Sequence, residues 1–229
     1  MKKIILTLLS AIFLSNISFA QTLTCEELNS DIEKWNSFKS NNNDKWANAI
    51  KDNKLYSMNS DGSFEYVYIM HSKDSLDIAT LRKIGFDFIN YYFPNIDNAT
   101  RADMETNSPD NGVIFKGLFA GLGEAVGFFS YSKINGNVLF DIRFKADRIR
   151  FSIKIQNYQV IKASNGVIVE NYTQYVNNTY PLNQKSDHKK SYAMAFINAN
   201  SKCLNYASNF FNYVNKHVAE SQPTQLEDW

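Results

Sequence analysis

Residues 141–155 read DIRFKADRIRFSIKI, and the positions of the apolar side chains in this stretch change halfway along. Up to Lys145 the apolar side chains stand at even positions, whereas from Arg148 onward they stand at odd positions. Neighbouring side chains of a strand point to opposite faces, so one straight strand cannot keep a single buried face through this change. A tight turn at Ala146-Asp147 restores the alternation and predicts an antiparallel hairpin, with a bulge as the alternative.

The apolar pattern on both sides of this hairpin predicts further strands and long helices. Alternation over residues 64–70 predicts a strand, and residues 76–92 repeat apolar side chains at helical spacing until Pro94 ends the helix. An Asn135-Gly136 turn is predicted to join two strands. The remaining strands are expected at residues 100–105, 113–119, 126–134, 138–145 and 167–175. These elements predict an α+β fold, with an antiparallel sheet of about five strands packed against helices.

The first 20 residues have the three parts of a secretory signal peptide. Lys2-Lys3 is followed by an apolar run over residues 4–14, and Ser18 and Ala20 supply small side chains before the expected cut. The run is shorter than the ~20 apolar residues of a membrane-spanning helix. We therefore expect a protein exported to the periplasm or beyond, with no membrane anchor after cleavage. The expected organisation is a signal peptide at 1–20, a helical extension and linker at 21–61, an α+β domain at 62–218 and a flexible tail at 219–229.

Two cysteines stand on the apolar faces of two predicted helices near the ends of the chain. Residues 24–27 form a capping box for a helix that carries Cys25, and an apolar stripe over residues 192–218 includes Cys203. Because disulfides persist in oxidising compartments, Cys25 and Cys203 are predicted to pair. The alternative is two buried thiols that act as small hydrophobic side chains.

The charge balance and the missing motifs exclude several classes of function. The chain holds 24 basic and 23 acidic residues, and loss of the two leader lysines (24 − 2 = 22) changes the formal charge from +1 to −1. This balance provides no field that attracts nucleic acid. The three histidines are far apart in the chain, and no HExxH, CxxC or GxSxG motif is present. We expect no metal and no cofactor, and the sequence by itself identifies no catalytic residue.

Two groups of side chains are candidates for binding. Five basic residues share one face of the predicted hairpin and suggest a strip that binds an acidic glycan or a partner protein: Arg143, Lys145, Arg148, Arg150 and Lys154. A solvated sheet face is the alternative for the strip. Six aromatic residues suggest a groove for a carbohydrate or peptide, with burial in the core as the alternative: Phe128, Phe129, Tyr131, Tyr172, Tyr175 and Tyr180.

Several short stretches carry a resemblance to a known family. They are residues 64–69 (FEYVYI), 72–76 (SKDSL), 115–117 (FKG) and 144–151 (FKADRIRF). Together with the leader, they resemble a domain-of-unknown-function family of secreted Bacteroidetes proteins whose fold is described as TATA-binding-protein-like (TBP-like). The resemblance covers about residues 62–218. It implies that fold and an exported location, and it implies no activity. The family's usual turn reads Lys-Asp-Gly-Arg, whereas this chain has Ala146-Asp147 in place of Asp-Gly.

These observations predict an exported, non-enzymatic binding module whose partner is an envelope or extracellular protein or glycan. One alternative is a hydrolase acting on glycan or peptide, with carboxylates that the fold brings together. A small-ligand carrier with an apolar cavity between sheet and helix is another alternative. A concave pocket with convergent titratable groups favours the enzyme, and a flat or shallow surface favours the binding module.

Overall fold

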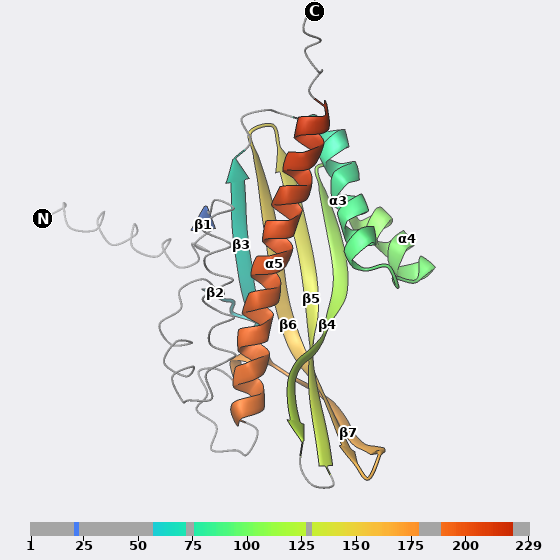
Figure 1. The fold of residues 1–229 in the computed structure, drawn as a ribbon, viewed down its shortest axis with the longest axis vertical. Helices are drawn as coiled ribbons and strands as arrows, with labels where there is room; N and C mark the ends of the chain where they lie inside the picture. Colours follow the sequence, from blue (N-terminus) through green and yellow to red (C-terminus); the bar gives the residue numbers. More distant parts are fainter. Residues whose placement is uncertain (1–20, 23–56, 72–75, 127–129, 179–188, 222–229) are drawn as a thin grey trace, which may run out of the picture.

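A computed structural model shows an antiparallel sheet of long strands with two long helices against one face (Figure 1). The structure describes residues 21–22, 57–71, 76–126, 130–178 and 189–221. The five long strands are β3 (Phe64–His71), β4 (Gly112–Val126), β5 (Ser130–Lys145), β6 (Arg148–Ser164) and β7 (Val167–Gln174). The predicted α+β class, with a sheet of about five strands, is confirmed.

β6 is the strand that connects the rest of the sheet. Residues 148–155 of β6 pair with β3, and residues 158–164 pair with β7. The other edge of β6 pairs with β5, which pairs in turn with β4. Two short strands, β1 (Gln21–Thr22) and β2 (Ser57–Met58), pair with β3. A short 3-10 helix, Val176–Asn178, follows β7.

The hairpin predicted at the parity change is confirmed. Lys145 of β5 lies opposite Arg148 of β6, so Ala146 and Asp147 form a two-residue turn. Neither turn residue has a positive φ. The turn therefore does not require the glycine that is usual in the family this sequence resembles.

The turn predicted at Asn135-Gly136 is wrong, because β5 runs straight through both residues. A Cβ at Gly136 would approach Leu122 Cδ1 to 2.8 Å, so this glycine serves close packing. A different Asn-Gly pair joins β6 to β7, where Asn165 has φ 50° and Gly166 has φ 80°. An Asn-Gly pair permits the left-handed conformation that a tight hairpin needs, but it does not impose that conformation.

A second change of parity occurs inside β6, and a β-bulge accommodates it. Buried apolar side chains stand at odd positions up to Ile155 and at even positions from Tyr158 onward. The pairing with β5 shifts here, since Val138 lies opposite Ile155 but Asn137 lies opposite Asn157. The extra residue in β6 keeps Tyr158 and Val160 on the same face as Ile155, toward the helices.

α3 (Ile78–Tyr92) and α5 (Lys189–Ser221) are the two long helices. α5 confirms the long C-terminal helix expected at residues 192–218. The Asp77 carboxylate accepts a hydrogen bond from Thr80 N at 2.9 Å and caps α3. Residues 72–75, which precede the helix, lie outside the described residues.

The strand predicted at residues 100–105 is wrong, because these residues belong to the helix α4 (Asn98–Asn107). The Asp97 carboxylate accepts a hydrogen bond from Thr100 N at 2.7 Å and starts the helix. Met104 is the buried residue of α4, so the helix shows no apolar stripe that a sequence pattern would reveal.

Aromatic rings fill the space between the sheet and the helices. Phe210 of α5 stacks on Phe151 of β6, with ring centroids 5.0 Å apart, and meets Phe88 of α3 edge-on at 5.0 Å. Tyr206 of α5 stacks on Phe93 and on Phe119, each at 5.4 Å. Burial of each ring contributes roughly 1.5–3 kcal/mol, so the contact between sheet and helices is the main apolar core.

Three predicted segments lie largely outside the described residues. They are the signal peptide at 1–20, the helix that carries Cys25 and the tail, of which residues 222–229 are not described. The predicted domain boundaries therefore stay predictions.

The two hairpin turns predict opposite responses to glycine. Replacing Gly166 by Ala should lower the free energy of unfolding by about 1 kcal/mol, because an L-residue is strained at φ 80°. Asp147→Gly should bring no gain, because its turn uses negative φ. Urea unfolding of both variants checks this, and a stabilising Asp147→Gly would contradict the turn geometry.

Candidate functional site

The five residues of the predicted basic strip lie on one face of the sheet, as the sequence predicted. Arg143 lies opposite Arg150, and Lys145 lies opposite Arg148. Their neighbours Phe144 and Ile149 point the other way and are fully buried in the core. The strip therefore occupies the face that points away from α3 and α5, which we call the outer face.

Most cations of the strip already have a carboxylate partner. Two carboxylates pair with the two arginines of the strip that lie opposite each other. Asp141 Oδ1 lies 2.5 Å from Arg143 Nε, and Glu65 Oε1 lies 2.8 Å from Arg150 Nη2. Arg150 Nη1 also lies 3.6 Å from Asp141 Oδ2. Lys154 pairs with Asp61 at 2.6 Å and Arg148 with Asp147 at 3.7 Å, whereas Lys145 has no ion pair with any described residue.

The five cations of the strip and their carboxylate partners together form a nearly neutral set, which we call the charge ladder. Five cations face four carboxylates, a formal sum of 5 − 4 = +1. An acidic glycan would have to displace carboxylates that are already in place. The paired side chains are partly exposed, so each pair contributes at most about 1 kcal/mol to stability. Binding at the strip stays a prediction, and the structure offers a better-shaped candidate elsewhere.

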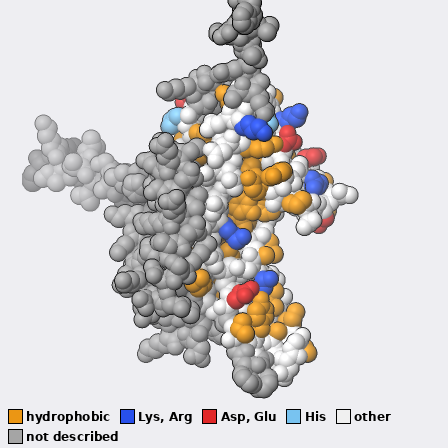
Figure 2. All heavy atoms as spheres, viewed as in Figure 1, with side chains coloured by type: hydrophobic (Ala, Val, Ile, Leu, Met, Phe, Trp, Pro, Cys, Tyr) orange, Lys and Arg blue, Asp and Glu red, His pale blue; other side chains and the backbone are white. Residues whose placement is uncertain are grey.

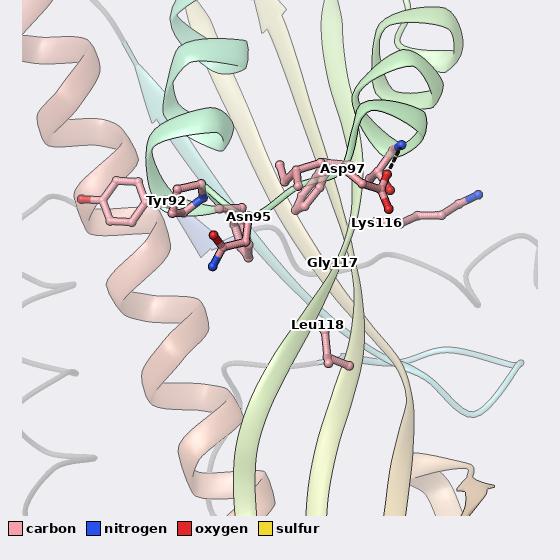
Figure 3. Close-up of a pocket in the computed structure, with 11 residues that line it drawn as sticks. Tyr92, Asn95, Asp97, Lys116, Gly117 and Leu118 are labelled. Carbon is pink, nitrogen blue, oxygen red and sulfur yellow. Dashed lines mark hydrogen bonds between the residues drawn. The ribbon is translucent and has the colours of Figure 1, made fainter.

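A cleft of about 350 Å³ lies where the end of α3, the start of α4 and β4 meet (Figure 3). Its apolar lining includes Phe93 and Phe115, whose ring centroids are 4.8 Å apart, and Leu118, which is 46% exposed. Asn95 and Lys116 belong to its polar lining. Nothing in the sequence pattern marks these residues, since they come from three separate elements.

Local sequence explains how the cleft forms. α3 ends at Phe93 directly before Pro94, which cannot donate a helical hydrogen bond. The chain then turns and Asp97 caps α4 three residues later. On β4, a Cβ at Gly117 would approach Phe115 Cε1 to 2.8 Å, so glycine leaves room for the Phe115 ring. The cleft is thus shaped by a helix end, a helix start and one glycine.

Asp97 and Lys116, the charged residues of the cleft, each interact with a neighbouring residue. Hydrogen bonds from the backbone and side chain of Thr100 lower the pKa of Asp97, which keeps this carboxylate ionised. Lys116 Nζ lies 4.0 Å from Asp103 Oδ2, and both side chains are more than half exposed. A carboxyl that serves as a general acid at neutral pH needs a raised pKa, whereas the pKa of Asp97 is lowered. The shape and lining of the cleft suit the binding of a ligand group.

A wider groove of about 860 Å³ runs between α3 and the residues around α4. Asp87, Glu105 and Asp110 line it and are all exposed. Arg82 in this groove donates to Pro109 O at 3.2 Å and lies 4.7 Å from the centroid of the Phe86 ring.

The predicted aromatic groove is not a single surface. Tyr131 lies opposite Ala163 on the outer face, whereas Tyr172 lies opposite Val160, a buried residue on the helix side. Tyr131 belongs to β5, which has a paired strand on each side, so its side chain and that of Tyr172 on the opposite face are separated by the sheet and do not line one groove. Phe128, Phe129 and Tyr180 lie outside the described residues.

Exposed apolar side chains gather at the end of the sheet that projects past α5 (Figures 1 and 2). Val167, Ile168 and Val169 follow one another in β7 and are 65%, 63% and 58% exposed. Val126 at the end of β4 is 78% exposed. The sequence shows this run of three branched residues, but it does not show that both faces of the strand are open. Exposed apolar patches often mark interaction sites.

The structure describes Cys203 and two of the three histidines, His71 and His217. Cys203 is fully buried, and burial raises the pKa of its thiol, which disfavours the reactive thiolate. Cys25 lies outside the described residues, so the predicted disulfide stays a prediction. His71 is exposed and His217 Nδ1 lies 2.9 Å from Tyr213 O. Within the described ranges, no three His, Cys, Asp or Glu side chains are grouped closely enough to hold a metal ion.

Comparison of the chain with protein-family models, with curated proteins and with solved structures finds no match. In the part of the chain that the structure describes, no helix has the length and apolar content needed to cross a membrane.

Removing the shared carboxylate of the ladder should expose the repulsion between Arg143 and Arg150, which lie directly opposite each other. We expect Asp141→Asn to lower the free energy of unfolding by about 1 kcal/mol at low salt and by less in concentrated salt. Asp87→Asn is the control, because Asp87 forms no ion pair with a described residue, and should stay within about 0.5 kcal/mol of the wild type. Equal effects of the two substitutions would contradict the ladder.

Asp61 should contribute pH-dependent stability. Hydrogen bonds from Lys154 and Ser63 lower the pKa of Asp61 from 3.8 to about 2. A lowered folded-state pKa gives stability that is present above the unfolded pKa and is lost as the pH falls from about 4 to about 2. Asp61→Asn should therefore cost less than about 1 kcal/mol at pH 7, because the side chain is half exposed, and only a small part of that at pH 2, where half of the folded-state carboxyls are protonated. Urea unfolding at both pH values checks this, and an undiminished cost at pH 2 would contradict it.

Proposed function

We propose that this chain is an exported, non-enzymatic binding module that holds an envelope or extracellular partner at the cleft between α3, α4 and β4. The observation that carries the proposal is the combination of an apolar lining with titratable groups that are already engaged. The cleft can receive a ligand group, but it offers no acid–base pair to transform that group.

The dimensions of the cleft indicate the kind of group that it accepts. About 350 Å³ is near the lower end of the range of ligand pockets, roughly 300–1,000 Å³. The rings of Phe93 and Phe115 offer apolar contact, while Asn95 can both donate and accept hydrogen bonds. One apolar or aromatic side chain of a partner protein, or one sugar ring of a glycan, fits this combination of size and chemistry.

The geometry supports the binding module better than the two alternatives. A hydrolase that works through two carboxyls requires them in different environments, whereas Asp97 caps α4 and Asp103 is more than half exposed. A small-ligand carrier requires an enclosed apolar space between sheet and helix. Phe151, Tyr206 and Phe210 pack into that region from both layers, so the described part of the interior supports a solid core.

The location and the finer fold class belong to the same proposal. The leader at residues 1–20 supports export to the periplasm or beyond, and the resemblance stated above supports a TBP-like arrangement of the sheet with an N-terminal helical extension. Neither argument depends on the cleft. The family membership suggested by that resemblance is likewise a proposal.

Filling the cleft should abolish binding without unfolding the protein. We expect Leu118→Trp to reduce the retention of at least one envelope component several-fold, because the larger side chain would occupy the space of the ligand group. The measurement is a pull-down from envelope extract with exported, immobilised protein, followed by identification of what is retained.

Ile78→Trp is the matched control, because Ile78 is 39% exposed and lies outside the cleft. Thermal unfolding of both variants shows whether the fold is kept. Identical retention by both variants would overturn the proposal. Turnover of an envelope glycan or peptide by the wild-type protein would favour the hydrolase.

A further inference from the structure

β7 presents an open edge at the projecting end of the sheet (Figure 1). One edge of β7 pairs with β6, and within the described ranges no strand pairs with the opposite edge. Backbone N–H and C=O groups along that edge lack a partner strand. Such a row of groups is a template for pairing with another extended strand.

Apolar side chains surround this edge. Val167, Ile168 and Val169 are each more than half exposed. Ile168 also ends a cross-strand row on the outer face, since it lies opposite Ala163, which lies opposite Tyr131. Figure 2 shows hydrophobic side chains at this end of the molecule. A strand added beside β7 would cover part of this apolar surface.

The edge has few of the features that normally prevent such pairing. β7 reads VIVENYTQ and contains no Lys, Arg or Pro. Its one charged residue is Glu170, which Lys162 of β6 neutralises at 2.7 Å. A register shift between Lys162 and Ala163 is the one protective feature, and it leaves regular pairing with β6 from Glu170 to Gln174.

We propose that β7 pairs with β7 of a second copy of this chain, antiparallel and across a two-fold axis at Asn171. A second copy is the natural occupant, because it always presents the same edge and nothing in β7 repels it. The near-neutral charge of the whole chain adds no repulsion between copies. This dimer does not use the cleft and goes beyond the proposed function.

The position of the axis follows from the charges of β7. Pairing centred on Glu170 would place two carboxylates directly opposite each other, which is unfavourable. Pairing centred on Asn171 places Glu170 opposite Tyr172 of the second copy. It also places the two Asn171 amides opposite each other, where each can donate and accept a hydrogen bond. A strand of eight residues is a small interface, so the dimer is weak and depends on concentration.

Analytical ultracentrifugation of the exported wild-type protein, from micromolar to millimolar concentration, tests the proposal. We expect the mean mass to rise toward that of a dimer. Hydrogen exchange at the backbone amides of residues 170–174 should slow over the same range of concentration. Asn171→Lys and Asn171→Asp should each weaken dimerisation about fivefold or more, because each places two like charges at the axis. A mixture of the two variants should restore the dimer, because opposite charges then meet.

Asn212→Lys is the matched control, because it adds the same charge at an exposed position on α5. A wild-type protein that stays monomeric at every concentration overturns the proposal and leaves the edge to another partner or to water. A dimer that both Asn171 variants retain places the interface elsewhere and also overturns it. A mixture that does not recover the dimer overturns the axis at Asn171. A cleft variant that fails to bind its partner but dimerises normally separates this proposal from the proposed function.

Discussion

The helix-facing side of β5 and β6 must stay apolar wherever α3 and α5 cover it. Phe140, Phe144, Phe151 and Ile155 meet this requirement and are fully buried. The apolar side chains change between even and odd positions twice along these two strands, and the chain accommodates each change in a different way. A two-residue turn separates β5 from β6 at Ala146-Asp147, and a bulge near Ile155 corrects the alternation within β6.

The same constraint places the charges on the outer face. When alternate residues of β5 and β6 point into the core, the residues between them point outward together, and Arg143 then lies directly opposite Arg150. The fold balances this repulsion with Asp141 from the same hairpin and Glu65 from β3. The shared face of the basic strip is thus a consequence of strand register, and two of its carboxylate partners, Glu65 and Asp61, come from a segment distant in the chain.

The surfaces proposed for binding lie where the helices stop covering the sheet. The cleft opens where α3 ends at Phe93 and the chain turns toward α4, and β7 extends past the end of α5. The cleft depends on Pro94, which ends α3, and on Gly117, which leaves room for the Phe115 ring. In both places the sheet continues beyond the helix, which leaves apolar side chains such as Leu118 and Ile168 exposed.

Local patterns in the sequence determined the hairpin at residues 145–148, the long helix that carries Cys203, the shared face of the basic strip and the α+β class, because alternation and helical spacing are properties of neighbouring residues. Only the tertiary structure decided which Asn-Gly pair turns, that residues 100–105 form a helix, and which carboxylates meet the strip. The cleft is likewise a tertiary feature. Each of these depends on contacts between residues far apart in the chain: Leu122 packs against Gly136, and Glu65 reaches Arg150. A pattern of neighbouring residues in the sequence does not show such contacts.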